Sequence, residues 1–419
     1  MSYRSLTRIL STCTFTITCM LSMSQAQSFS VLHNFAGGNS GAYPYDGLTM
    51  DSAGNFYGTT WQGGSNNQGM VFKLYQRNGS WIFAPVYSFR GGNDGALPYA
   101  GVTIGPDGAL YGTTSSGGLG APGCPGGCGT VYKLTPPANF CQRSSCPWNE
   151  TVLYDFYQSG VGLWDPWAGV IFDHAGNMYG TTTLGGMVPC PNSSAGCGAV
   201  YKLIPAGSTW TAQVLYSFTG GSDGSIPYAG LVMDSGGNLY GATFYGAAYQ
   251  GYGAIFELAK NGTSWTERTL YDFQGGSDGG NPQATLVFDA AGNLFGGTSS
   301  SNGPSLTGVA FELSPSGNNW NYSVIASFNG SIVQNLTFDR GGNLYGTTLF
   351  GGAHGFGSVF KLTNSGGSWT PTDLYDFDYH NGGATDPWSS VAIDSSGNLF
   401  GTTNGGGTGG AGVVWQVTP

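Results

Sequence analysis

The chain is an array of seven imperfect repeats. A strand pattern ending in (Leu/Phe)-Tyr-Gly-Thr-Thr, or a close variant, recurs with its glycine at Gly58, Gly112, Gly180, Gly241, Gly296, Gly346 and Gly401. The intervals are 54, 68, 61, 55, 50 and 55 residues, and each repeat contains four apolar runs of strand length. A repeat of this size cannot bury a core alone and must stack on its neighbours. The array therefore favours a propeller or a solenoid.

The order of the four runs, called a to d, distinguishes these folds. In the fourth repeat they are residues 230–234, the strand through Gly241, 253–258 and 270–273. The seventh repeat lacks run d at the C-terminus, whereas an equivalent run, 31–35, stands alone near the N-terminus. An N-terminal strand that completes the last blade closes a ring without an open edge.

We therefore predict an all-β, seven-bladed β-propeller of four-stranded antiparallel blades, closed by the N-terminal strand. The alternative, a β-solenoid, has shorter rungs and needs capped ends. The propeller is expected to occupy residues 27–419. Its predicted blades span residues 47–89, 101–156, 169–218, 230–273, 285–328, 335–377, and 390–417 together with 29–35.

Residues 1–26 have the features of a secretory signal peptide. Arg4 and Arg8 precede an apolar run from Ile9 to Met23, and Ser24-Gln25-Ala26 is a small-x-small cleavage site. The run is too short for a spanning helix of about 20 residues. We expect a secreted or periplasmic protein, associated with the cell surface only through something outside this sequence, with no transmembrane segment after cleavage.

The composition and net charge of the chain limit the classes of molecule that it is expected to bind. Gly contributes 75 of 419 residues, whereas only 8% are charged, and many aromatic residues accompany this low charge, which disfavours disorder. The net charge of −10 disfavours nucleic acid and anionic lipid as partners. We expect a monomer that binds a glycan or an extracellular protein.

Six cysteines of the mature chain form three close pairs: Cys124 with Cys128, Cys141 with Cys146, and Cys190 with Cys197. In an exported chain such pairs predict three local disulfides. A zinc site is the alternative, because the first two pairs have ligand spacing. The propeller, however, would place those two pairs on opposite faces.

The repeats resemble those of bacterial exported proteins of the GloVer (Gloeo/Verruco repeat) type, whose pattern is approximately GNLYGTT–GG–GTVFKL–LYSF–GG-DG–P–GLV-D. The resemblance covers essentially the whole mature chain, and GLVMDSGGNLYG (230–241) is also similar to the NHL propeller repeat. Blade 6 departs from the pattern, since Ser331-Ile332-Val333 replaces the Gly-Asp-Gly…Pro loop, and blade 5 has Gly297 in place of a Thr. The resemblance implies an exported propeller without known catalytic residues.

The loop from run d to the next run a carries the main candidate site. It ends in Pro-aromatic in five repeats, and in a meander all d–a and b–c loops share one face. The repeat should therefore gather these side chains around the channel mouth, with two glutamines in blades 5 and 6. The predicted ligand-binding residues are Tyr45, Tyr99, Trp167, Tyr228, Gln283, Gln334 and Trp388. Aromatic rings with nearby amides suit sugars, whereas the alternative is packing between blades.

Carboxylates in glycine-rich turns form a second candidate set. Asp94, Asp223 and Asp278 lie in Gly-(Asn/Ser)-Asp-Gly loops that offer oxygens to calcium, although their spacing matches no dedicated calcium loop. Turn formation is the alternative role. The aspartates that end run a, as in Asp234, precede Gly-Asn and predict hairpin turns. We therefore expect no cofactor, with calcium as the alternative.

One His-carboxylate group is available for acid–base or metal chemistry. His354 and His380 fall in loops of one face on neighbouring blades, with Asp378 and Asp386 close in sequence. Solvated loop histidines are the alternative reading. No nucleophile elbow, phosphate loop or zinc-protease motif occurs. A binding or scaffold propeller is the first hypothesis, and a hydrolase or lyase with its site at the channel mouth is the second.

Overall fold

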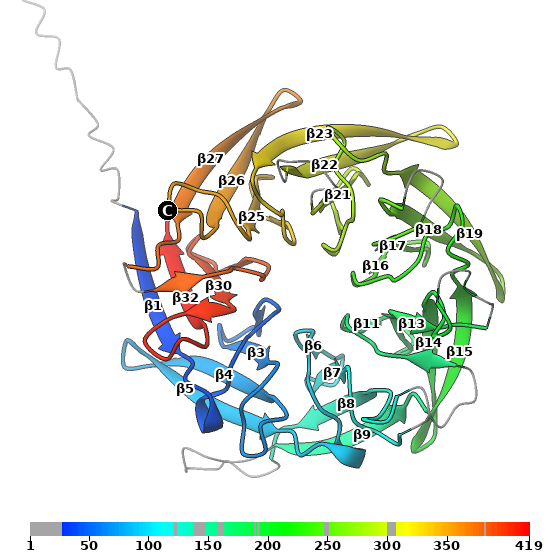
Figure 1. Cartoon of the computed structure of the whole chain (residues 1–419), viewed down its shortest axis with the longest axis horizontal. Coiled ribbons are helices and arrows are strands. Elements are labelled where there is room, and N and C mark those ends of the chain that lie inside the picture. The colour runs from blue at the N-terminus through cyan, green and yellow to red at the C-terminus, as the bar shows by residue number, and fades with distance from the viewer. Residues whose placement is uncertain are drawn as a thin grey trace, which may run out of the picture.

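Seven four-stranded antiparallel sheets form a closed ring in the computed structural model of the protein (Figure 1). The structure describes residues 27–120, 124–137, 148–157, 162–187, 190, 193–246, 251–299, 307–380 and 383–419; the predicted signal peptide lies outside them. The innermost strands face a central axis and the longest strands form the rim. The predicted all-β, seven-bladed propeller is confirmed.

Each blade is a meander whose strands pair in order from the axis outward. Blades 1 to 3 consist of β2–β5 (Thr49–Met50, Phe56–Thr60, Met70–Arg77, Ser80–Ser88), β6–β9 (Thr103–Ile104, Leu110–Thr114, Thr130–Thr135, Asn149–Asp155), and β11, β12, β14 and β15 (Ile171–Phe172, Met178–Thr182, Ala199–Ala206, Thr209–Ser217). Blades 4 to 6 consist of β16–β19 (Val232–Met233, Leu239–Thr243, Ala254–Asn261, Ser264–Asp272), β20–β23 (Val287–Phe288, Leu294–Gly297, Thr307–Ser316, Asn319–Asn329), and β24–β27 (Thr337–Phe338, Leu344–Thr348, Ser358–Ser365, Ser368–Asp376).

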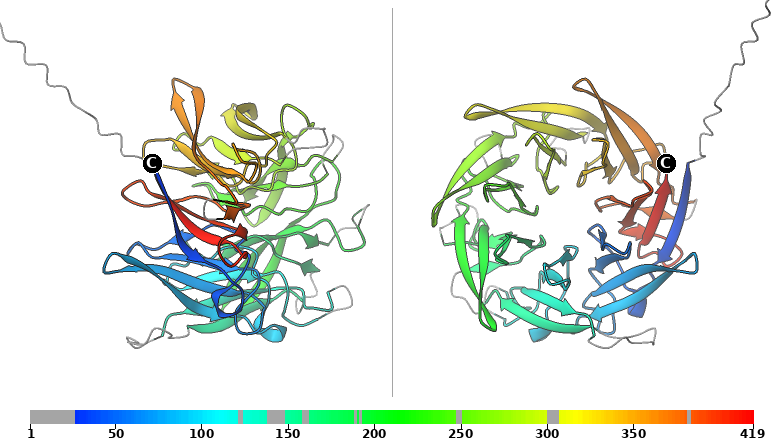
Figure 2. Two further views of the ribbon diagram at one scale, coloured as in Figure 1. Left: turned by 60° about the vertical axis from the view of Figure 1, so that its left-hand side comes forward. Right: turned by 180° about the vertical axis from the view of Figure 1, so that it is seen from behind.

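Blade 7 closes the ring with strands from both ends of the chain. Its order is β29 (Ala392–Ile393), β30 (Leu399–Thr403), β32 (Val413–Thr418) and β1 (Ser28–Asn34). β1 runs antiparallel to β32, and both lie side by side at the rim in Figure 2. The N-terminal strand thus pairs the edge that β32 would otherwise expose.

Short elements lie in the loops between the main strands. They are two two-stranded ladders, β10 (Leu163–Trp164) with β13 (Leu184–Gly185) and β28 (Ala384–Thr385) with β31 (Gly405–Gly406), and the 3-10 turns η1 (Gly38–Ser40) and η2 (Gly92–Asp94).

A side-chain-capped turn joins the two inner strands of a blade. Asp51 Oδ1 accepts the backbone N–H of Ala53 and of Asn55, each at 2.9 Å, and Oδ2 accepts the side-chain amide of Asn55 at 2.7 Å. Gly54 has φ 79°, the left-handed region that the turn requires. The turn after Asp234 also pairs its carboxylate with the asparagine four residues later. These aspartates form the predicted hairpin turns.

Adjacent blades interlock where the proline of a d–a loop, present in every such loop except that between blades 5 and 6, meets a glycine. A Cβ on Gly198, which has φ 90°, would lie 2.6 Å from Pro227 Cδ and 2.5 Å from Thr182 O. Gly69 meets Pro98 in the same way. The proline therefore packs between blades, as the structural alternative for this loop predicts.

A threonine in the second strand also joins each of several blades to the next. Thr59 Oγ1 donates to Ala100 O at 2.9 Å, and the same bond joins Thr113 to Ala168 O, Thr181 to Ala229 O, Thr347 to Ser389 O and Thr402 to Asp46 O. Blades 4 and 5 have Ala242 and Gly297 at this position. Their junctions therefore need another connection, which the pocket described below contains.

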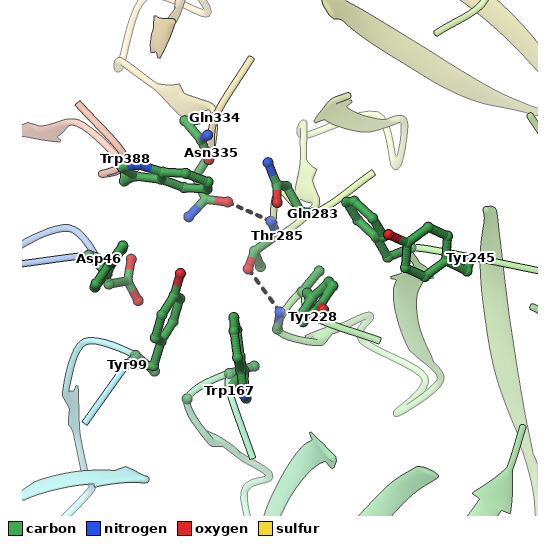
Figure 3. A pocket seen from close by; sticks show the side chains of 17 residues that line it. Asp46, Tyr99, Trp167, Tyr228, Tyr245, Gln283, Thr285, Gln334, Asn335 and Trp388 are labelled. Carbon is green, nitrogen blue, oxygen red and sulfur yellow. Dashed lines mark hydrogen bonds between the residues drawn. The ribbon is translucent and has the colours of Figure 1, made fainter. Parts of the chain in front are cut away.

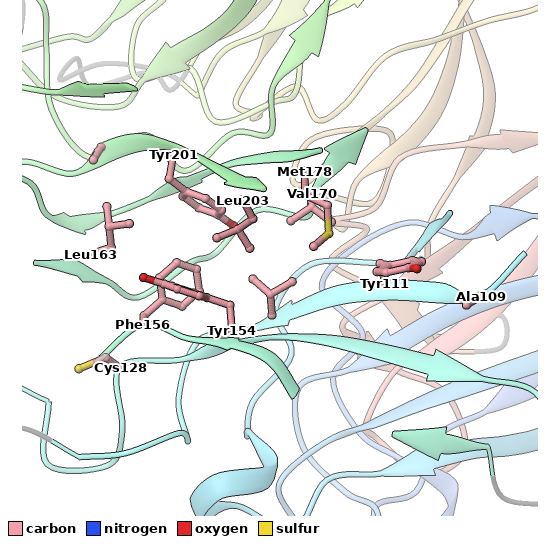
Figure 4. Close-up of a cluster of buried hydrophobic side chains, with 12 residues drawn as sticks. Ala109, Tyr111, Cys128, Tyr154, Phe156, Leu163, Val170, Met178, Tyr201 and Leu203 are labelled. Atoms are coloured by element: carbon pink, nitrogen blue, oxygen red, sulfur yellow. The ribbon is translucent and has the colours of Figure 1, made fainter. Parts of the chain in front are cut away.

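The core is divided among the seams between blades. Figure 4 shows the seam between blades 2 and 3, where Tyr111, Phe156, Met178 and Tyr201 are buried together. Because each seam buries apolar surface from two blades, no blade has a complete core of its own.

Two of the three predicted disulfides are confirmed, Cys124–Cys128 and Cys190–Cys197. They close b–c loops of blades 2 and 3. The third predicted disulfide would join Cys141 and Cys146. Both Cys141 and Cys146 lie outside the described residues, so this pairing stays a prediction from the sequence.

Candidate functional site

A pocket of about 290 Å³ opens on the axis of the ring (Figure 3). Side chains from all seven blades line it, which places it at the channel end where the d–a loops enter. All seven residues predicted to surround the channel mouth belong to its lining. The full lining is Tyr45, Asp46, Tyr99, Ala100, Trp167, Ala168, Gly169, Tyr228, Ala229, Gly230, Phe244, Tyr245, Gln283, Thr285, Gln334, Asn335 and Trp388.

The backbone before each proline sets the direction of the aromatic side chain. The preceding residue adopts a left-handed conformation in six blades: Tyr43, Leu97, Asp165, Ile226, Asn281 and Asp386 have φ between 50° and 60°. This conformation is unfavourable for most residues, and more so for a β-branched one. At Leu97 it is held from both sides, since its N–H donates to Gln68 O at 2.8 Å and its C=O accepts from Ser115 N. The following Pro98 then directs Tyr99 toward the axis.

Four of the aromatic rings form a continuous curved stack. Tyr45 lies against Tyr99 with ring centroids 4.5 Å apart, Tyr99 against Trp167 at 4.2 Å, and Trp167 against Tyr228 at 4.9 Å. Tyr99 has an aromatic ring on each side, Tyr45 stacked and Trp167 tilted by 32°, so it presents an edge and its hydroxyl to the pocket. Burial raises the pKa of Tyr99 strongly, helped by Tyr45, Tyr228 and Asp46. This hydroxyl therefore stays protonated and able to donate.

Trp388 differs from the other rings. Its ring contact within the described part of the chain is with Tyr45, edge-on, at 6.1 Å and 68°. It is partly exposed, and in Figure 3 it lies across the pocket from Trp167 and Tyr228. Trp388 thus retains an aromatic face that no stacked neighbour covers among the described rings.

Amide and hydroxyl groups form the wall opposite the aromatic stack. Thr285 Oγ1 accepts Gly230 N–H at 3.0 Å, and Asn335 Oδ1 accepts Thr285 N–H at 2.5 Å. These two bonds join blade 4 to blade 5 and blade 5 to blade 6, the two junctions without the threonine bond. At these two junctions, the bonds of Thr285 and Asn335 take the place of the threonine bond on the side that faces the pocket.

Gln334 enters the pocket from an unexpected position. When blades 5 and 6 are aligned at Leu286 and Leu336, Gln334 corresponds to Ala284. Val333 then stands at the position that an aromatic residue occupies in most blades. Val333 is fully buried, whereas Gln334 lines the pocket at 4% exposure, and its Nε2 has no hydrogen-bond partner among the described atoms. The polar group is present as predicted, one position later than the repeat implies.

Sequence reasoning missed the polar pocket residues Asp46, Thr285 and Asn335, and Asp46 is the one with a charge. Its Oδ1 accepts Gly47 N–H at 2.6 Å and its Oδ2 accepts Gly101 N–H at 2.7 Å. Burial raises the pKa of Asp46, although these two N–H groups oppose the rise. A comparison of equivalent positions would have found it, because four other blades have alanine there: Ala100, Ala168, Ala229 and Ala284.

The His-carboxylate group is only partly assembled. His380 Nδ1 lies 3.1 Å from Asp378 Oδ1, and its side chain is 86% exposed. The His380 backbone N–H, the His380 ring and His354 lower the pKa of Asp378. Asp386 instead accepts the Thr385 hydroxyl at 3.2 Å. Within the described chain, none of these four residues lines the pocket.

The three candidate calcium ligands lie in separate loops and bond within them. Asp223 accepts the Tyr216 hydroxyl at 3.0 Å and the Thr219 N–H at 2.7 Å. Asp278 and Asp94 accept the same kind of tyrosine hydroxyl and backbone N–H in their own loops. The described residues contain no group of three His, Cys, Asp or Glu side chains that would hold a metal ion.

The fold and the site define a class: a repeat propeller with a polar and aromatic pocket on its axis. Comparison with known families agrees, since the model of the Gloeobacter/Verrucomicrobia repeat matches residues 14–145 and 121–339. The chain belongs to this family, as the resemblance of its repeats predicted. No curated protein matches the sequence significantly.

Two solved structures have the same architecture at low identity. The extracellular domain of BT4673 from B. thetaiotaomicron, assigned as a one component system, is 12% identical with a TM-score of 0.55; the match covers 92% of this chain and 40% of that one. YCF48 bound to D1 peptide is 11% identical with a TM-score of 0.51, over 94% of this chain and 95% of that one. This chain therefore spans less than half of the first protein, and both comparisons show the fold alone.

The described residues include no helix that is long and apolar enough to span a membrane. The two disulfides fit an exported protein, because disulfides persist in oxidising compartments.

Proposed function

We propose that this protein is a binding propeller of the periplasm or cell surface whose axial pocket holds the end of a carbohydrate chain. The supporting observation is the division of the pocket into an aromatic wall and an amide wall. Sugar rings present C–H faces that lie on aromatic rings, and hydroxyl groups that pair with amides and carboxylates. The pocket's size, at the lower end of the usual range of about 300–1,000 Å³, suits one or two sugar rings.

The lining favours binding over hydrolysis. Glycoside hydrolysis usually uses two carboxyl groups about 5–9.5 Å apart. Asp46 is the one carboxyl group of the described lining, and His380 and Asp378 lie outside it. A ligand can therefore be recognised here without an acid–base pair to cleave it.

A protein ligand is the second candidate, supported by the surface around the pocket. Seven large hydrophobic side chains are exposed in the described chain, and six of them lie in loops of the pocket face: Leu119, Tyr157, Met187, Tyr245, Phe350 and Tyr379. These six side chains, called the rim here, are spread over the loops of several blades, and apolar groups on this face suit a polypeptide more than a polysaccharide. The pocket itself is too small for a standard protein interface, so a protein would engage the rim.

Substitution of Trp167 and Trp388 by alanine tests the carbohydrate proposal. A glycan array selects a ligand, and isothermal titration calorimetry measures its Kd. Loss of two aromatic surfaces should weaken binding by about tenfold or more. Tyr379→Ala is the matched control, because Tyr379 is 63% exposed on the same face and does not line the pocket. Equal affinity in the folded double variant would contradict the proposal, and a loss only in Tyr379→Ala would indicate the rim.

A further inference from the structure

Blades 6, 7 and 1 contribute four pocket side chains, and three of them (Asp46, Gln334 and Asn335) have no counterpart at the equivalent position of another blade. They are Asn335 and Gln334 from blade 6, Trp388 from blade 7 and Asp46 from blade 1. In the view of Figure 3, Trp388, Asn335 and Asp46 lie on the same side of the pocket that they line, with the carboxylate of Asp46 and the amide of Asn335 beside the central space. These four side chains form one arc of the pocket lining. Because no described aromatic ring stacks on Trp388, the arc combines an aromatic ring that is open to stacking with polar groups.

Each of the two amides of the arc has an NH₂ group without a hydrogen-bond partner among the described residues. Thr285 N–H requires an acceptor, so the oxygen of Asn335 faces Thr285 and its NH₂ group faces elsewhere in the pocket. Gln334 Nε2 is almost completely buried and has no partner among the described atoms. A buried donor without an acceptor is unfavourable. The Asn335 NH₂ group therefore suits a ligand with hydroxyl or ring oxygens, whereas Gln334 Nε2 lies beneath the pocket surface and reaches a ligand only if its amide turns.

Asp46 determines which charge the arc accepts. Each of its oxygens receives one backbone N–H and has a further lone pair, so the carboxylate can take additional donors. No Lys, Arg or His belongs to the described lining to balance its charge. Burial raises its pKa, as expected for a carboxyl group without a cationic partner. An anionic ligand is disfavoured here, and a ligand ammonium would complete the pair.

We propose that this arc is a subsite for an amino sugar with a free ammonium group. The sugar ring lies on Trp388, its ammonium group pairs with the Asp46 carboxylate, and one of its oxygens accepts from the Asn335 NH₂ group. This assignment rests on the proposed carbohydrate-binding function and narrows it to a cationic sugar. The chain's net charge of −10 favours the same ligand charge at a distance.

Three trisaccharides of similar size test this assignment on the mature chain by titration calorimetry. They are the β-1,4 trimers of glucosamine, N-acetylglucosamine and glucose, at a pH where the ammonium group is charged. We expect the glucosamine trimer to bind about tenfold or more tightly than the other two. In Asp46→Asn, which keeps the size of the side chain, the three affinities should converge. Because the parent protein already ranks the sugars, the test does not depend on how the variant folds.

The outcomes separate the two proposals. If the glucose or N-acetylglucosamine trimer binds as tightly as the glucosamine trimer, the ammonium assignment is wrong and carbohydrate binding stands. Tighter binding of a glucuronic acid trimer would also overturn the assignment. If no sugar binds and tetramethylammonium does, both proposals fail, and the aromatic wall is a cation site instead. If none of the probes binds, both proposals also fail.

Discussion

Glu150 provides a direct test of how the seam between blades 1 and 2 responds to pH. It lies in β9, and its Oε1 is buried without a hydrogen-bond partner among the described atoms. Burial raises its pKa from the ordinary 4.5 to about 7, with a further rise from Asp94 and an opposing effect of Arg90. We predict that Glu150→Gln stabilises the protein above pH 7 and has little effect at pH 4.5.

The magnitude and sign follow from the pKa. A group whose pKa is higher in the folded state stabilises the fold while protonated, and that contribution is lost as pH rises from 4.5 to about 7. The full rise of the Glu150 pKa, from 4.5 to about 7, corresponds to about 3.4 kcal/mol of folding free energy at 1.36 kcal/mol per pKa unit. Since the side chain is only partly buried, solvent screening reduces the expected effect to about 1–2 kcal/mol.

Chemical denaturation of parent and variant at pH 4.5, 6 and 8 measures this effect. The difference in free energy of unfolding, variant minus parent, should increase across the series, because other titrating groups contribute equally to both proteins. A difference independent of pH would show that Glu150 is not held protonated by burial, and would refute the reasoning.

Two further substitutions test the contacts between blades. Gly198→Ala places a Cβ 2.5 Å from Thr182 O at φ 90°, and urea denaturation should show a free energy of unfolding lower by about 2–4 kcal/mol. Gly207→Ala is the control, because Gly207 has φ 67° and open space around it. This control should lower the free energy of unfolding by only about 1 kcal/mol. Thr113→Val keeps the shape but removes the donor to Ala168 O, and should cost about 1–2 kcal/mol; an unchanged midpoint would show that this bond contributes nothing net.

The architecture was predictable because it depends on features present in every repeat. The four runs per repeat, the Asp-x-x-Gly-Asn turns and the displaced run at 31–35 need only local patterns and their order. The position of the aromatic residues followed in the same way, since a proline in a fixed place directs each one.

The polar residues of the pocket were harder to predict because they break the repeat. Asp46 stands where four blades have alanine, and a single carboxylate gives no motif. Gln334 was assigned from a loop without its proline, so its position was one residue off. Which of these side chains meet depends on closure of the ring, since Asp46 in blade 1 and Gln334 in blade 6 are far apart in sequence.

The blade 6 side of the pocket's asymmetry can be traced to one short loop. Residues 328 to 336, from the last phenylalanine of blade 5 to the first leucine of blade 6, are eight apart, whereas the preceding loop from Phe273 to Leu286 is thirteen. In the short loop, Val333 packs so close to blade 5 that a Cβ at Gly297 would lie 2.5 Å from Val333 O. Blade 5 therefore cannot have the threonine that joins other blades.

Asn335 then has two roles that follow from the same change. Its oxygen bonds Thr285 N–H and restores a connection between blades 5 and 6, while its NH₂ group remains in the pocket. Stability alone would require only the oxygen, so Asn335→Asp should preserve the bond to Thr285 and keep the free energy of unfolding within about 1 kcal/mol. It should nevertheless reduce binding of a neutral ligand that accepts from this NH₂ group. Unchanged binding of a neutral ligand in the folded variant would show that Asn335 serves the seam alone.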